Sequence, residues 1–147
     1  MSRVKIKFPK QNPLFIAEVP VRVTDINYGG HVGNDSILSI IQEARVLFYN
    51  NMGYTELEFG GVGTIMADVA ISYKSEGFCG DVFEIEIYVT GIKEYGFLIL
   101  YKIIKKGSTP ITEIAHASSN IVCFDYNDRK VALMPEEVKN KLSIVKN

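Results

Sequence analysis

The sequence predicts one α+β domain, spanning residues 1–147, in which an antiparallel sheet of about five strands wraps around one long central helix. One segment repeats its apolar residues with the 3.6-residue period of a helix, and the segments after it alternate with a period of two, as strands do. Apolar residues make up 47% of the 147-residue chain, enough for one substantial core. The apolar face of the helix and the apolar face of the sheet must both be buried, and the simplest arrangement that buries them together curls the sheet around the helix.

The first two elements are a strand and the long helix. Residues 15–24 are rich in β-branched side chains and predict a strand, in which Pro20 indicates an edge or a bulge. Residues 35–51 predict the helix, with Asn34 or Asp35 placed to cap its start and Gly53 placed to end it. Its apolar face consists of Ile37, Ile40, Ile41, Ala44, Leu47 and Phe48.

Four strands follow, over residues 65–73, 83–89, 97–105 and 111–124, and we expect them to form a four-stranded antiparallel meander. In the first of these strands, Ile65 and Val69 should share one face and Asp68 should lie on the other. A short terminal helix begins at Pro135. This arrangement leaves sheet edges uncovered, and we expect a second copy of the chain to cover them in a dimer.

Charge and composition exclude several classes of partner. The net charge of −1 and the pI near 6.1 do not indicate the excess of positive charge that binds a nucleic acid or an anionic membrane. No stretch approaches membrane-spanning length, and the start of the chain lacks the apolar run of a secretory signal, so we expect a cytoplasmic protein. Cys79 and Cys123 have no CxxC partner and are expected to be buried free thiols.

The densest polar cluster, residues 25–34 with the sequence DINYGGHVGN, runs directly into the helix. The first N–H groups of a helix lack internal partners and carry partial positive charge, which suits them to hold an oxygen that becomes negative during a reaction. Gly29 and Gly30 would let another molecule approach closely. We therefore predict that N–H groups near Gly30, His31 or Val32, with those of Gly30 and His31 first, are free to polarise a carbonyl group, with a plain tight turn as the alternative.

Residues 21–34, followed by Gln-Glu-Ala-Arg at 42–45, resemble the hot-dog-fold thioesterases related to hydroxybenzoyl-CoA thioesterase and the plant acyl-ACP thioesterases. The resemblance continues at residues 63–68, 73–74, 80–81 and 133–136, so it spans most of the chain. It implies a homodimer or a dimer of dimers (a homotetramer) that hydrolyses acyl thioesters of coenzyme A or of acyl carrier protein. It also implies no metal, and no cofactor apart from coenzyme A as part of the substrate.

Asn27 departs from the pattern of this family, because many members have an aspartate there that acts as nucleophile or general base. An amide can do neither. Two consequences remain open: hydrolysis through a water that Asn27 holds and another base activates, or binding of the thioester without turnover.

Three further residues are candidates for catalysis. Glu43 is the first candidate for the base, because it flanks the apolar stripe of the helix, where partial burial would favour that role; an exposed helix acid is the alternative. His31 matches the histidine of the plant-type motif and can hydrogen-bond the thioester, orient water or protonate the departing thiolate, unless it only caps its own loop. Asp25 can orient Asn27 or His31, and a turn-forming role is equally compatible.

The remaining candidates are expected to bind substrate. Gly29, Val32 and Asn34 belong to the loop that precedes the helix. Asp68, an acid within a strand, is expected to act across a dimer interface or to lie on a solvated face. Lys74 is expected to meet the phosphates of coenzyme A or to be an ordinary surface lysine.

Other chemistries lack their motifs in this sequence. It contains no GxxxxGK loop, no GxGxxG and no GxSxG elbow, and its two histidines and two cysteines lack metal-ligand spacing. Two rival functions remain. Asp25, Asn27 and His31 are also similar to the aspartate, asparagine and histidine of hot-dog enoyl-thioester hydratases, although three residues separate Asn27 from His31, one more than that pattern has. The other rival is a non-catalytic module that binds acyl thioesters.

Overall fold

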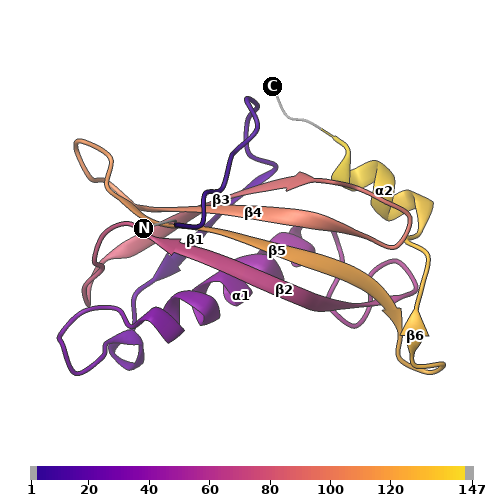
Figure 1. Cartoon of the computed structure of the whole chain (residues 1–147), viewed down its shortest axis with the longest axis horizontal. Helices are drawn as coiled ribbons and strands as arrows, with labels where there is room; N and C mark the ends of the chain where they lie inside the picture. Colours follow the sequence, from indigo (N-terminus) through magenta and orange to yellow (C-terminus); the bar gives the residue numbers. More distant parts are fainter. Residues whose placement is uncertain (1–2, 145–147) are drawn as a thin grey trace.

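The computed structural model describes residues 3–144. The helices and strands occur in the order β1 (Phe15–Pro20), a 3-10 helix (Val23–Asp25), α1 (Asn34–Asn51), β2 (Gly63–Tyr73), β3 (Val82–Thr90), β4 (Gly96–Lys105), β5 (Glu113–Asp125), β6 (Lys130–Val131) and α2 (Glu136–Leu142). The predicted α+β class is confirmed, since one long helix lies along one face of a single antiparallel sheet (Figure 1). The sheet has six strands because the chain after β5 returns as the two-residue strand β6.

The strand order is β1-β3-β4-β5-β2, with β6 paired to β5. The predicted four-stranded meander is therefore wrong: only β3, β4 and β5 follow one another, and β2 pairs with β5 rather than with β3. The 13-residue β5 pairs with β4 on one side and with the 11-residue β2 on the other. As a result β2 forms one edge of the sheet and β1 the other.

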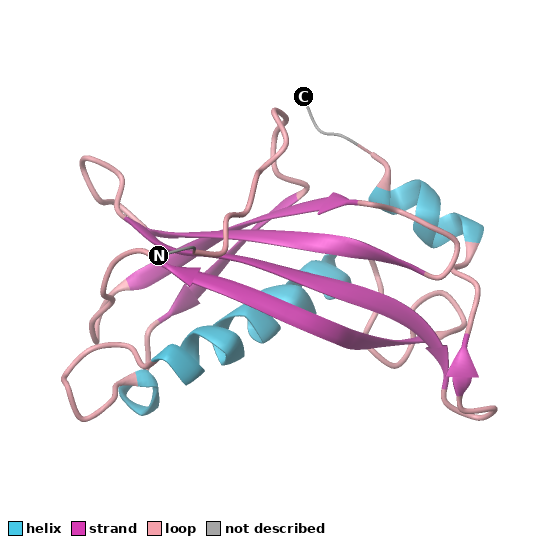
Figure 2. Ribbon diagram, in the orientation of Figure 1, coloured by secondary structure: helices cyan, strands magenta, loops and turns pink. Residues whose placement is uncertain are grey.

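Helix α1 lies along one face of the sheet (Figure 2), and its apolar residues are part of the buried core. Five of the six predicted face residues are buried, but Leu47 is 36% exposed, and Arg45 and Tyr49 are buried instead. From the strands, alternate residues point toward the helix and are buried: Ala17 and Val19, Phe83, Ile85 and Ile87, Ile99, Tyr101 and Ile103, Ala115, Ala117 and Ile121. We call this side of the sheet the helix face and the opposite side the outer face.

The first strand is shorter than predicted. It ends at Pro20, which pairs with Val82, and the chain then turns into the 3-10 helix. Proline has no N–H group to continue the ladder, so the strand stops where this residue stands. The helix ends also differ in detail, because Gly33 occupies the N-cap position in place of Asn34 or Asp35, whereas Gly53 follows the last turn with φ +87° as predicted.

A bulge in β2 changes which side chains share a face. The register shifts between Met66 and Asp68, so that Ile65 pairs with Val122 and Asp68 pairs with Asn120. These partners are two residues apart on β5, which places Ile65 and Asp68 together on the outer face. The prediction that Asp68 faces away from Ile65 is therefore wrong, because strict alternation does not survive an extra residue.

The two cysteines have different surroundings. Cys79 is exposed and Cys123 is buried, and neither forms a disulfide, so the prediction of free thiols is confirmed while the prediction of burial is wrong for Cys79. Cys79 lies in the loop that joins β2 to β3 rather than in a strand. Burial raises the pKa of the Cys123 thiol to about 11. Within residues 3–144, neither α1 nor α2 is an apolar segment long enough to cross a bilayer.

Candidate active site

The loop before α1 closes around the side chain of Asn27. Its Oδ1 accepts hydrogen bonds from the N–H groups of Gly29 (2.9 Å) and His31 (3.4 Å). The N–H of Gly30, a residue with φ +83°, donates to the carbonyl oxygen of Asn27 (3.1 Å). The N–H of Val32 donates to the carbonyl oxygen of Gly77 (2.8 Å). Gly30, His31 and Val32 therefore differ from our prediction, because their N–H groups are already paired within the chain.

The free N–H groups lie one step further along the chain. The N–H of Gly33 donates to the carbonyl oxygen of Asp25, and the carbonyl of Gly33 accepts from Ser36 and Ile37. Among residues 3–144, the N–H groups of Asn34 and Asp35 have no acceptor, as expected for the first two residues of a helix. They carry the positive end of the dipole of the 18-residue helix α1.

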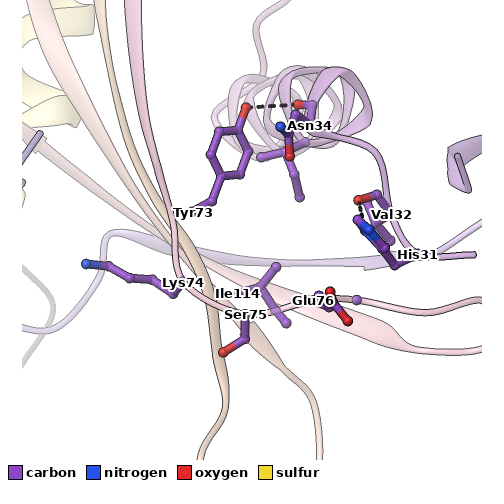
Figure 3. A pocket seen from close by; sticks show the side chains of 10 residues that line it. His31, Val32, Asn34, Tyr73, Lys74, Ser75, Glu76 and Ile114 are labelled. Atoms are coloured by element: carbon purple, nitrogen blue, oxygen red, sulfur yellow. Dashed lines mark hydrogen bonds between the residues drawn. The ribbon is translucent and has the colours of Figure 1, made fainter. Parts of the chain in front are cut away.

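A cavity of about 190 Å³ opens beside this helix start (Figure 3). The loop and the first turn of α1 form one wall, and the end of β2 with the residues that follow forms the other. The hydroxyl of Tyr73 donates to the carbonyl oxygen of Asn34 (3.1 Å) and so joins the two walls. The lining residues are His31, Val32, Asn34, Ile37, Tyr73, Lys74, Ser75, Glu76, Gly77 and Ile114.

His31 is the histidine of this cavity, and its tautomer follows from one contact. Its Nδ1 lies 3.1 Å from the carbonyl oxygen of Val32, and because a carbonyl can only accept, the Nδ1–H must donate. In the neutral ring this leaves the lone pair on Nε2 free to accept a proton. A Cβ on Gly29 would lie 3.4 Å from Nε2, so the glycine leaves room for the ring.

Glu43 lies on α1 as predicted but is not partly buried, so it follows the alternative of an exposed helix acid. Its side chain is exposed on α1, nine residues after Asn34, which is about 13 Å along the axis at about 1.5 Å per residue. The carboxylate in the cavity is that of Glu76, which the sequence analysis missed. The only sequence signal near it is the resemblance at Tyr73 and Lys74, directly before it in the chain.

Asp25 is 3% exposed and serves the loop rather than the cavity. Its carboxylate accepts hydrogen bonds from the N–H (2.8 Å) and the guanidinium (3.1 and 3.2 Å) of Arg22. Burial opposes the charged form, but these hydrogen bonds and the charge of Arg22 outweigh it and hold the pKa of Asp25 below its ordinary value. Asp25 therefore faces Arg22 and not Asn27 or His31.

Two other predicted binding residues are placed differently. Both carboxylate oxygens of Asp68 accept from the side-chain amide of Asn120 (2.9 and 3.0 Å), in a separate outer-face cavity of about 560 Å³ that also contains Lys93 and Tyr95. Lys74 lines the His31 cavity, although its side chain points away from the other labelled side chains in Figure 3. Of the predicted residues, the structure thus brings His31, Val32, Asn34 and Lys74 together.

A second polar cluster is buried between α1 and the sheet. Arg45, which is 5% exposed, donates from Nε to Glu56 (2.8 Å) and from a terminal nitrogen to the hydroxyl of Tyr101 (3.5 Å). The hydroxyls of Tyr101 and Ser119 are 2.9 Å apart. Burial raises the pKa of Tyr101. We call these four residues the Arg45 cluster, and its groups are engaged with one another.

Within the described residues, no group of three or more histidine, cysteine, aspartate or glutamate side chains is arranged to hold a metal ion. The lining of the His31 cavity instead includes the start of α1 at Asn34, the imidazole of His31 and the carboxylate of Glu76. Such a set can polarise a carbonyl group and move a proton.

The chain is similar in structure to several solved proteins. The 1,4-dihydroxy-2-naphthoyl-CoA thioesterase Slr0204 of Synechocystis superposes with a TM-score of 0.78 at 21% identity, over 87% of this chain and 94% of that one. The PA2801 protein of Pseudomonas aeruginosa gives 0.81 at 17% identity, over 90% and 100%. The gentisyl-coenzyme A thioesterase BH1999 gives 0.76 at 19% identity, over 88% and 100%. At these identities the likeness establishes the hot-dog fold. No curated protein matches the sequence.

The sequence also matches a family model, that of the thioesterase-like superfamily, over residues 21–142. The match begins just after β1 and includes the Asn27 loop, α1, all of the later strands and α2. The chain therefore belongs to the thioesterase-like superfamily and is a thioester hydrolase with a hot-dog fold.

Proposed function

We propose that the protein is an acyl-CoA thioesterase that hydrolyses its substrate to a free carboxylic acid and the thiol of coenzyme A in the His31 cavity. The observation that supports this most is the pair of unpaired N–H groups, of Asn34 and Asp35, beside a cavity that also contains His31 and Glu76. A thioester carbonyl at the helix start would receive two hydrogen bonds that strengthen as its oxygen becomes negative.

In the proposed reaction, Nε2 of His31 takes a proton from a water whose oxygen attacks the thioester carbon. The carbonyl oxygen becomes an oxyanion held by the N–H groups of Asn34 and Asp35. When the tetrahedral intermediate collapses, the C–S bond breaks, and the imidazolium returns its proton to the departing sulfur. The carboxylate of Glu76 stabilises the imidazolium while it is charged.

This assignment revises the roles expected of Asn27 and Glu43. Because Oδ1 of Asn27 accepts two backbone hydrogen bonds, the amide holds the loop in shape and does not have to act as a base. An aspartate is then not needed at this position for hydrolysis, since His31 supplies the base. Glu43, about 13 Å along the helix, has no part in the reaction within one protomer.

The cavity volume bears on the acyl group. An apolar cavity of about 150 Å³ can hold a benzene molecule, so the about 190 Å³ found here suits an acyl group of about one ring or a short chain. We propose substrates of this size, carried by coenzyme A.

The experiment is a thiol-release assay with acetyl-, butyryl-, hexanoyl-, palmitoyl- and benzoyl-CoA and with hexanoyl acyl carrier protein. We expect the wild type to release thiol fastest from hexanoyl- or benzoyl-CoA, Glu76→Gln to lose about 10-fold or more of kcat, and the matched Glu43→Gln to remain within about twofold. Hydration of crotonyl-CoA without thiol release would instead identify a hydratase, and saturable binding without product a binding module. Equal losses in Glu43→Gln and Glu76→Gln would overturn the assigned roles.

We also propose a homodimer that acts in the cytoplasm and needs no metal or further cofactor. The edge strand β2 supports the dimer, because its 11 residues leave backbone groups unpaired on one side and expose Ile65, Met66 and Tyr73. Light scattering after size exclusion separates monomer, dimer and tetramer, and an unchanged rate after treatment with a chelator is expected if no metal takes part.

A further inference from the structure

The N-terminal strap, which we define as residues 3–14, crosses the outer face of the sheet before β1 begins. It precedes the residues that match the family model, which start at 21. At its end nearest β1, the N–H of Leu14 donates to the carbonyl oxygen of Ile87 in β3 (2.7 Å). The strap therefore lies outside the residues that match the family model and is anchored first on β3.

The middle of the strap is held by Phe8. Its ring centroid lies 5.3 Å from that of Tyr88 in β3 and 4.9 Å from that of His116 in β5, the latter edge to face. The ammonium of Lys102 in β4 lies 4.7 Å from the same ring. One aromatic ring thus contacts three neighbouring strands, and the cation over its face adds to the apolar contact.

The far end of the strap reaches the wall of the His31 cavity. The guanidinium of Arg3 donates to the carbonyl oxygen of Tyr73, the last residue of β2 (2.6 Å). Tyr73 in turn donates from its hydroxyl to the carbonyl oxygen of Asn34, at the start of α1. The next residue, Lys74, and then Ser75 donate their N–H groups to the carbonyl oxygen of Ile114 (2.9 and 3.2 Å).

We infer that the strap is a positioning element: Arg3, held in place through Phe8, fixes the wall formed by Tyr73, Lys74, Ser75 and Glu76 at the distance from the helix start that binds the thioester. An edge strand has no neighbour on its outer side, so its last residues rely on such contacts to stay in place. The inference rests on the proposed function for its kinetic effect but not for its structural effect.

The test compares Arg3→Ala with Lys5→Ala, a matched variant that removes one positive charge from an exposed position on the same strap. We expect Arg3→Ala to raise KM about 3- to 10-fold with kcat within about twofold, and Arg3→Lys, which keeps a donor, to restore most of the loss. Hydrogen exchange at the amides of Lys74 and Ser75 should become faster in Arg3→Ala by a similar factor and remain unchanged in Lys5→Ala.

A second variant, Phe8→Ala, tests whether Arg3 acts as part of the strap or only through its own hydrogen bond to Tyr73. Because both residues act through one strap, the double variant should have nearly the same KM as either single variant rather than the product of two effects. Unchanged KM and exchange in Arg3→Ala, or equal changes in Lys5→Ala, would overturn the inference. If the wild type hydrolyses no thioester, the proposed function fails, and the exchange rates alone then decide whether the strap holds the wall.

Discussion

Two polar regions, one at the start of helix α1 and one further along it, differ in what surrounds them. At the start of the helix, the N–H groups of Asn34 and Asp35 have no acceptor among the described residues, and His31 and Asn34 line a cavity of about 190 Å³. In its middle, the guanidinium of Arg45 is packed against Glu56 and Tyr101 and is 5% exposed. The comparison separates a region whose donors are left unpaired beside a cavity, as the proposed chemistry requires, from one whose polar groups satisfy one another and hold the fold together.

The largest effect should come from His31→Ala. The change removes the proposed base while deleting only one side-chain hydrogen bond, to the carbonyl of Val32. We expect kcat/KM to fall about 10²- to 10⁴-fold and the free energy of unfolding to change by about 0.5 kcal/mol or less. Thiol release and urea unfolding on the same preparations measure both quantities. A large loss of stability would show that this region is structural like the other one.

Arg45→Met should have the opposite effect, a large loss of stability with little change in activity. It removes the charged partner of Glu56 and a donor to Tyr101, both in or beside the core. We expect the free energy of unfolding to fall by about 2–4 kcal/mol, with kcat per folded molecule within about threefold. Urea unfolding monitored by circular dichroism measures the loss. An unchanged midpoint would contradict the structural role of the Arg45 cluster.

A matched pair of tyrosine variants sharpens the contrast at the level of single hydroxyl groups. Tyr101→Phe removes a buried hydroxyl that bonds Ser119, and we expect a loss of stability of about 1–2 kcal/mol without a change in KM. Tyr73→Phe removes the hydroxyl that joins the cavity walls, and at 38% exposure it should cost about 0.5 kcal/mol or less but raise KM about threefold. Steady-state kinetics and urea unfolding of the two variants decide between the regions.

The smallest effect concerns His116, which belongs to neither region and lies under Phe8 of the strap. Burial lowers its pKa below the ordinary value of 6.5; Lys74 and Lys102 lower it further, and Glu113 opposes them. A base whose folded pKa is depressed contributes stability that is present above 6.5 and is lost as the pH falls through the folded pKa. Proton NMR should find this low pKa in the wild type and a value closer to 6.5 in Phe8→Ala. A wild-type value at or above 6.5 would contradict the burial.

The elements of the fold could be predicted well because their signals are local. The apolar period of α1 and the alternation of the strands lie within single segments, and the predicted helix start differs from the observed one by one residue. The position of β2 could not be predicted, because its pairing with β5 depends on contacts about 50 residues apart. The bulge between Met66 and Asp68 could not be predicted either, since nothing in the local sequence pattern indicates an extra residue in the strand.

The candidate site was predicted in part for the same reason. His31, Val32 and Asn34 lie in one polar segment, which drew attention to them. Glu76 was missed because only the fold brings it into the same cavity as His31, from 45 residues further along the chain. The free N–H groups were placed a few residues too early, because the hydrogen bonds that Asn27 makes with its own loop are not visible in the residue pattern.

The two edges of the sheet have an unequal capacity to grow. β1 has six residues and ends in Pro20, which offers no N–H to a neighbouring chain, whereas β2 is 11 residues long. If two copies pair through β2, as in the proposed homodimer, each copy has used its one long edge, and the association stops at two chains. Pro20 thus keeps short the one edge at which the proposed dimer would otherwise add a further strand.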